Sequence, residues 1–113
     1  MKKPEFDWGI DFENFLNSLT EKDKAFLLEM IVRIEDLGMQ DSIRKNRVKK
    51  LEDNLYEIRL IGTDKKLIRS IYFQLKENQY YIVSGFIKKT DKTPLREIKK
   101  AKERRNKELN RDE

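Results

Sequence analysis

The chain has 113 residues and a mass of 13.7 kDa, and 42% of its residues are charged while 37% are hydrophobic. This length suits one domain with a single core, so we expect 1–113 to fold as one unit whose last residues, 106–113, fray. The absence of cysteine and histidine excludes disulfides, thiolate chemistry, structural zinc sites and histidine bases. Any chemistry must rely on Lys, Arg, Tyr, Asp, Glu, Ser or Thr, and we expect no cofactor and no metal.

Charge is distributed unevenly along the chain. Residues 1–42 hold five Lys/Arg and ten Asp/Glu, whereas residues 43–113 hold 21 and 11. The basic second part favours a polyanionic partner, nucleic acid before anionic membrane, although basic residues that only keep a small domain soluble explain it too. No apolar run approaches the roughly 20 residues that span a bilayer, and MKKPEFDWG lacks the apolar centre of a signal peptide. We therefore expect a soluble, cytoplasmic protein.

The first forty residues predict two helices. The segment DFENFLNSL has the apolar spacing of a buried helix face, with Phe12, Phe15, Leu16 and Leu19 on one stripe. A second helix begins after Thr20 as the N-cap, with Asp23 at the third position, and ends at Gly38 in the left-handed conformation. Because almost no linker separates the two helices, we expect an αα-hairpin that serves as scaffold.

The apolar pattern changes to a period of two after residue 54. The segments LYEIRLI (55–61), LIRSIYFQL (67–75) and YYIVSGF (80–86) predict three strands, and GTDKK and KENQ predict the turns between them. Such short turns imply an antiparallel meander. The preceding segment DSIRKNRVKKLEDN (41–54) predicts a loop or a short edge strand.

A helix follows the last predicted strand. Thr93 and Pro94 are suited to its N-cap and first position, and Leu95, Ile98 and Ala101 form its apolar stripe. The expected fold class is therefore α+β, with an N-terminal αα-hairpin, an antiparallel sheet of three to four strands and a C-terminal helix. We expect the sheet to be covered on one side.

Arg69 lies in the middle of an apolar strand. A buried guanidinium without a partner is costly, so we expect Arg69 either to pair with a carboxylate such as Glu57 or to open onto a groove. In both alternatives Arg69 lies with other charged side chains of strands 55–61 and 67–75.

Three segments, in this order, resemble the RelE superfamily of bacterial toxins, in particular its phage-derived HigB-like branch: VKKLEDNLYEIRL, RSIYF and IVSGFIKKTDKTPLREIKKAKER. The resemblance covers about residues 12–105 and implies the RelE-like toxin fold. It implies the toxin of a type II toxin–antitoxin pair, an mRNA interferase that cuts mRNA on the ribosome. The implied partner is a helix-turn-helix, HigA-like antitoxin. The chain would contact operator DNA only indirectly, through this antitoxin.

Relatives in that superfamily often open with an extra strand. Here MKKPEFDWG is short, charged and contains Pro4, so we expect this strand to be absent or frayed. Two other functions stay open beside the toxin nuclease: a ParE-like inhibitor of DNA gyrase, which is no nuclease, and a nucleic-acid-binding corepressor module.

RNA cleavage by such toxins uses the 2′-OH as nucleophile. The reaction needs removal of the 2′-OH proton, stabilisation of charge at phosphorus and protonation of the leaving 5′-oxygen. Arginine suits the second task because its fork binds phosphate and stays charged. The resemblance places Arg59 and Arg69 at basic catalytic positions, and Lys88, with Lys89 as the alternative, just after the last strand.

Lysine as a general base would require a large change in its pKa. Neutrality at pH 7 needs a fall of about 3 units from ~10.4, which exposed like charges rarely produce without burial. Lys88 therefore fits charge stabilisation and acid donation better. Tyr72 and Glu57 are candidates for assisting proton transfer, with a core tyrosine and an ion-pair acid as the structural alternatives.

Basic residues also gather before the first predicted strand. We expect them, together with one lysine after the last strand, to contact substrate or ribosomal RNA; the alternative is a solvated basic loop. Contacts to phosphate of this kind position RNA without choosing its sequence. The residues are Arg44, Lys45, Arg47, Lys49, Lys50 and Lys92.

Overall fold

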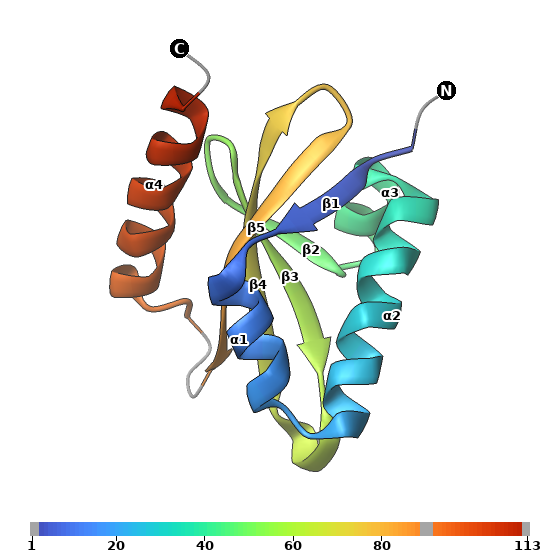
Figure 1. Ribbon diagram of the computed structural model, residues 1–113. Helices are drawn as coiled ribbons and strands as arrows, with labels where there is room; N and C mark the ends of the chain where they lie inside the picture. Colours follow the sequence, from blue (N-terminus) through green and yellow to red (C-terminus); the bar gives the residue numbers. More distant parts are fainter. Residues whose placement is uncertain (1–2, 89–91, 112–113) are drawn as a thin grey trace.

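The computed structural model describes residues 3–88 and 92–111 (Figure 1). A mixed sheet separates helices α1, α2 and α3 on one face from α4 on the other, so both faces are covered and not one as expected. The α+β class and the C-terminal helix are confirmed. The elements are β1 (Glu5–Trp8), α1 (Ile10–Ser18), α2 (Glu21–Leu37), α3 (Met39–Arg44), β2 (Val48–Glu52), β3 (Leu55–Ile61), the 3-10 turn η1 (Thr63–Lys65), β4 (Leu67–Lys76), β5 (Gln79–Lys88) and α4 (Leu95–Asn110).

The sheet has five strands in the order β1-β5-β4-β3-β2. Strands β3, β4 and β5 form the expected antiparallel meander, and β2 adds to it antiparallel to β3. Strand β1 pairs with β5 in parallel. The expectation of three to four antiparallel strands was therefore wrong in strand number and in sheet type.

Strand β1 is the element that was expected to be absent or frayed. The Phe6 ring packs edge-on against Tyr72, with centroids 4.9 Å apart, and the Phe6 N–H donates to Glu35 Oε2 at 2.8 Å. The Trp8 indole packs on Phe12 and donates to Glu13 Oε2 at 2.8 Å. Contacts to α1, α2 and β4 thus hold a four-residue strand that its own charged sequence does not predict.

Helices α1 and α2 lie within one residue of their predicted bounds. The Thr20 cap is confirmed, because its hydroxyl accepts a hydrogen bond from the Asp23 N–H at 3.2 Å. Gly38 ends α2 with φ 86° and ψ 165°, which is not the left-handed helical conformation, since the chain continues there directly into α3. Over 41–54 a loop or a short edge strand was expected; β2 is that edge strand, whereas the end of α3 at Arg44 was not expected.

The two helices share a face of the sheet but have different main neighbours. Helix α1 packs on β5 and β1, whereas α2 packs on α3 and β1, so the αα-hairpin stays a prediction. The contact between α1 and β5 is close, because a Cβ at Gly85 would overlap the Phe15 ring. On this side the buried core consists of Phe12, Leu16, Leu27, Ile31, Ile34, Val48, Ile58, Leu60, Ile68, Tyr72 and Ile82.

Helix α4 covers a second, smaller core of Leu55, Ile71, Phe73, Val83 and Ala101. Its N-cap is Pro94 and not Thr93, because the Thr93 hydroxyl donates to Glu57 Oε2 instead of capping the helix. The helix continues to Asn110, and Leu109 packs against the core, so part of the tail that was expected to fray is ordered. No helix in the part of the chain described here is long and apolar enough to cross a membrane.

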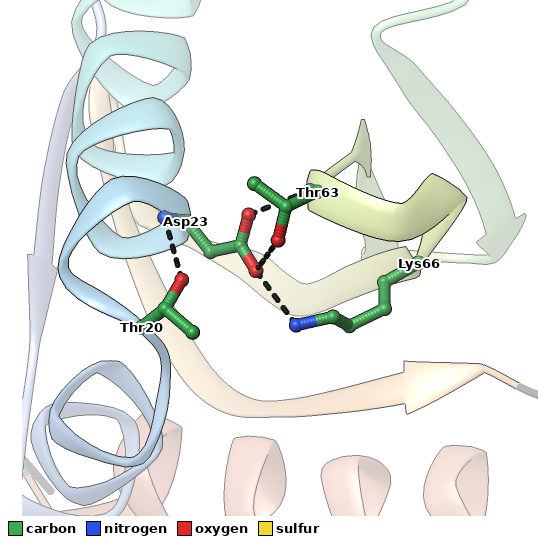
Figure 2. A network of polar contacts seen from close by, with 4 residues as sticks. All are labelled: Thr20, Asp23, Thr63 and Lys66. Atoms are coloured by element: carbon green, nitrogen blue, oxygen red, sulfur yellow. Dashed lines mark hydrogen bonds and ion pairs between the residues drawn. The ribbon is translucent and has the colours of Figure 1, made fainter.

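A buried carboxylate ties α2 to the turn between β3 and β4 (Figure 2). Asp23 Oδ1 accepts a hydrogen bond from the Thr63 backbone N–H at 2.7 Å, and Oδ2 accepts from the Thr63 hydroxyl and from Lys66 Nζ, both at 3.0 Å. The Thr63 backbone bond, helped by Lys66, lowers the pKa of Asp23 from 3.8 to about 2 against the opposing effect of burial. The Asp23 carboxylate therefore stays charged while it links α2 to the β3–β4 turn.

We expect this network to make folding stability sensitive to acid. The pKa of Asp23 is lower in the folded chain, so its contribution is present above about pH 4 and is lost as the pH falls toward about 2. Asp23→Asn should lower stability at neutral pH and flatten its dependence on pH over that range, as measured by urea unfolding. Asp36→Asn is the matched control, because Asp36 lies on the same helix in an exposed ion pair with Lys3. Equal effects in both variants would contradict the prediction.

Candidate functional site

Charged side chains from four adjacent strands lie on the α4 side of the sheet. Arg59 of β3 is the direct partner of Arg69 of β4, and Lys88 of β5 is the partner of Leu67, two residues before Arg69. Directly paired residues, and residues two apart on a strand, share a face of a sheet. Glu57 lies on the same face, opposite Lys49 of the edge strand β2. We call this set of five residues the basic face.

Arg69 is buried in the centre of the basic face, with 4% of its surface exposed. Its Nε lies 3.5 Å from Glu57 Oε1, and its NH1 group donates to the carbonyls of Ile68 at 3.1 Å and Leu60 at 3.4 Å. The expected ion pair with Glu57 is confirmed. Burial lowers the pKa of Arg69, Glu57 opposes that effect and Arg59 adds to it.

Lys88 is also buried, with 6% of its surface exposed. Burial is the main cause that lowers its pKa; Glu57 raises it, while Arg69, Arg59 and Lys49 lower it further. Crowding by like charges was evident in the sequence, but the burial was not. A lysine in this setting releases its proton more readily than an exposed one.

Glu57 is the carboxylate at the centre of this arrangement and is fully buried. The Thr93 hydroxyl donates to its Oε2, and its Oε1 faces Arg69. Neither Glu57 Oε1 nor Arg69 Nε makes a hydrogen bond within the described residues, so the pair holds together by charge. Sequence reasoning missed Thr93 here, because a threonine before proline is also a good helix cap.

A cavity of about 390 Å³ opens beside the two arginines. Asn46, Arg59, Ile61 and Arg69 line it. The Arg59 side chain has no ion-pair partner among the residues that the structure describes, so the only carboxylate paired to the guanidinium groups of this cavity is Glu57. The positive charge is thus concentrated where the surface is hollow, as anion-binding sites require.

A comparison with protein-family models identifies the family of the chain. A family model described as phage derived protein Gp49-like (DUF891) matches residues 14–106, which is most of the chain. The chain belongs to the Gp49-like family. This family includes RelE-like toxins and is associated with toxin–antitoxin systems. A search of curated proteins found no match.

Not all basic residues predicted to contact RNA join the basic face of this Gp49-like chain. Lys49 lies on it, and the Arg47 carbonyl accepts from the Arg59 N–H at 2.8 Å. Lys50 pairs with Tyr56 and so lies on the opposite face. The remaining predicted RNA contacts are exposed: Arg44 in an ion pair with Asp41, Lys45 at the end of α3, and Lys92 before α4. Lys89, the alternative to Lys88 as a catalytic residue, lies outside the described residues.

Tyr72 lies apart from the basic face. It is fully buried on the side of α1–α3, stacks on Tyr56 with ring centroids 5.3 Å apart, and donates to Met39 Sδ at 3.1 Å. Burial raises its pKa far above the usual value. The structure brings together Arg59, Arg69, Lys88 and Glu57 but separates Tyr72 from them, because successive strand residues point to opposite faces.

Proposed function

We propose that this Gp49-like protein is the toxin of a type II toxin–antitoxin pair and that its basic face cleaves RNA. The observation that carries the proposal is the charge arrangement: Arg59 directly opposite Arg69, with buried Lys88 beside them and Glu57 as the buried counterion. Like charges directly opposite each other on a sheet destabilise the fold. A bound phosphate relieves that repulsion, and the transition state of phosphate cleavage carries more negative charge still.

The residues have distinct roles in the proposed reaction. Arg59 and Arg69 bind the non-bridging phosphate oxygens and stabilise the charge that develops when the 2′-OH oxygen, which gives up its proton to water, attacks phosphorus. Lys88, whose pKa burial lowers, donates a proton to the leaving 5′-oxygen. Glu57 is a positioning residue, held by Thr93, that keeps the Arg69 guanidinium in place. The required 2′-OH restricts the substrate to RNA.

The partners follow from the family and from the sequence segments that resemble HigB-like toxins. We infer that the substrate is mRNA on translating ribosomes and that a HigA-like, helix-turn-helix antitoxin neutralises the toxin. The association of the Gp49-like family with toxin–antitoxin systems supports an antitoxin partner. We infer that the exposed residues Arg44, Lys45 and Lys49 contact RNA phosphates around the site, which would position the substrate without reading its sequence.

Induction of the chain in bacterial cells tests this function. We expect growth arrest together with new mRNA 5′ ends, mapped across the transcriptome within minutes, and no sign of DNA breaks. Co-expression of the cognate helix-turn-helix antitoxin should restore growth. DNA breaks without new mRNA ends would contradict the proposal and would favour inhibition of DNA gyrase instead.

A further inference from the structure

The cavity beside the basic face is lined by residues of two chemical kinds. Arg59 and Arg69 are suited to bind phosphate, whereas Asn46 and Ile61 carry no charge. Ile61, at the end of β3, leaves 67% of its surface exposed, and Asn46 is exposed in the turn before β2. The Ile61 side chain contributes nothing to phosphate binding, and the Asn46 amide brings no charge to it, so these two residues need a separate explanation.

The backbone holds Asn46 firmly at the edge of this cavity. Asn46 adopts φ 60°, a left-handed conformation that asparagine tolerates better than most residues, and its N–H donates to the Ile43 carbonyl at 3.0 Å. The next residue, Arg47, is bonded on both sides: its N–H to the Ser42 carbonyl at 2.9 Å, and its carbonyl to the Arg59 N–H at 2.8 Å. The turn is therefore fixed against β3, while the Asn46 side chain makes no hydrogen bond to another described residue.

We propose that Asn46 and Ile61 form a subsite for one unpaired nucleobase of the RNA whose phosphate the arginines bind. This inference rests on the proposed function. The amide offers one donor and one acceptor side by side, which matches the Watson–Crick edge of a base, and Ile61 covers the face of the ring. The cavity volume, about 390 Å³, lies within the range of roughly 300–1,000 Å³ typical of small-ligand pockets.

The subsite has a consequence for the form of the substrate. A base in a duplex already uses its Watson–Crick edge, so Asn46 can reach that edge only in a single strand. The two arginines by themselves make no such distinction, because single-stranded and duplex RNA both carry phosphates. The arginines recognise only the charge of the phosphate. Asn46 therefore adds selection for single-stranded RNA and for the identity of the base next to the cleaved bond.

Substitution of Asn46 tests which edge is read. Asn46→Ala should lower cleavage at the preferred sites roughly tenfold, as expected for the loss of a paired set of hydrogen bonds. Asn46→Asp presents two acceptors and no donor, so the mapped cleavage sites should shift toward guanine, whose N1–H and N2–H are adjacent donors. Asn78→Ala is the matched control, because Asn78 has φ 59° in the remote β4–β5 turn. Unchanged cleavage sites in Asn46→Asp would overturn the subsite.

A binding measurement separates this inference from the proposed nuclease function. Fluorescence anisotropy would compare a 2′-deoxy hexanucleotide with a hexamer of abasic deoxyribose phosphates, which carries the same charge. Wild type should bind the base-bearing strand several-fold more tightly, and the Asn46→Ala/Ile61→Ala variant should lose that difference while it keeps its affinity for the abasic strand. Val32→Ala, on the exposed side of α2, is the control for loss of a surface apolar group.

The two readouts have distinguishable outcomes. If wild type shows the difference between base-bearing and abasic strands but never cleaves RNA, the subsite stands and the nuclease proposal fails. If wild type cleaves RNA but binds both strands equally, the nuclease proposal stands and the subsite is overturned.

Discussion

Lys88→Met is expected to lower RNA cleavage by roughly 10²- to 10⁴-fold, the range that a positioned general acid contributes. Methionine keeps the length of the buried stem and removes the ammonium group, which is crowded by Arg59, Arg69 and Lys49. Because burial and these neighbours disfavour the charge, the variant should be at least as stable as wild type. The measurement is the rate of mRNA cleavage, paired with thermal unfolding of the same preparation.

Lys76→Met is the matched control for that experiment. Lys76 is an exposed lysine at the end of β4, next to the hairpin and away from the basic face, so its loss should change neither cleavage nor stability appreciably. A folded Lys88→Met variant that cleaves RNA as fast as the control would remove Lys88 from the site.

The largest effect on stability is expected for Glu57→Ala. The substitution leaves Arg69 buried without its counterion and removes the acceptor of the Thr93 hydroxyl. Breaking a buried pair from one side costs about 3–5 kcal/mol, because the remaining charge is uncompensated. Urea unfolding followed by circular dichroism should show this loss in the free energy of unfolding.

The double variant Glu57→Ala/Arg69→Met provides the decisive comparison. Removal of both charges leaves no unpaired guanidinium in the core, so the double variant should be more stable than Glu57→Ala alone. Both variants should lack RNA cleavage, since each lacks either Arg69 or the group that positions it. The single variant Arg69→Met completes the comparison: if the stability losses of the two single variants add up to that of the double variant, the pair does not interact.

The meander and the pairing of Arg69 were predictable because they depend on local patterns. Strand 55–61 alternates apolar and charged residues and matches β3 without a shift in its bounds. An arginine in an apolar strand needs a partner, and Glu57, two residues before Arg59 on the next strand, was the near carboxylate. The same alternation separates Tyr72 from Arg69, but it was not applied to Tyr72, which stayed a candidate for proton transfer.

The rest of the site depended on contacts between distant segments. Lys88 is buried near Glu57 and Arg69, which lie far from it in the sequence, and no pattern around residue 88 shows this burial. Strand β1 is held by the Phe6–Tyr72 contact, across most of the chain. Thr93 satisfies a helix-cap pattern, but its hydroxyl is taken by Glu57, because an ionised buried acceptor is the stronger partner.

The central claim is that the basic face cleaves RNA by attack of the 2′-OH. The most direct test incubates the purified chain with ribosomes that carry a defined mRNA and identifies the chemistry of the new ends. Wild type should produce a 5′-hydroxyl and a 2′,3′-cyclic phosphate at discrete positions, and Lys88→Met should not. Intact mRNA in the presence of folded wild-type protein, or identical cleavage by both proteins, would contradict the claim.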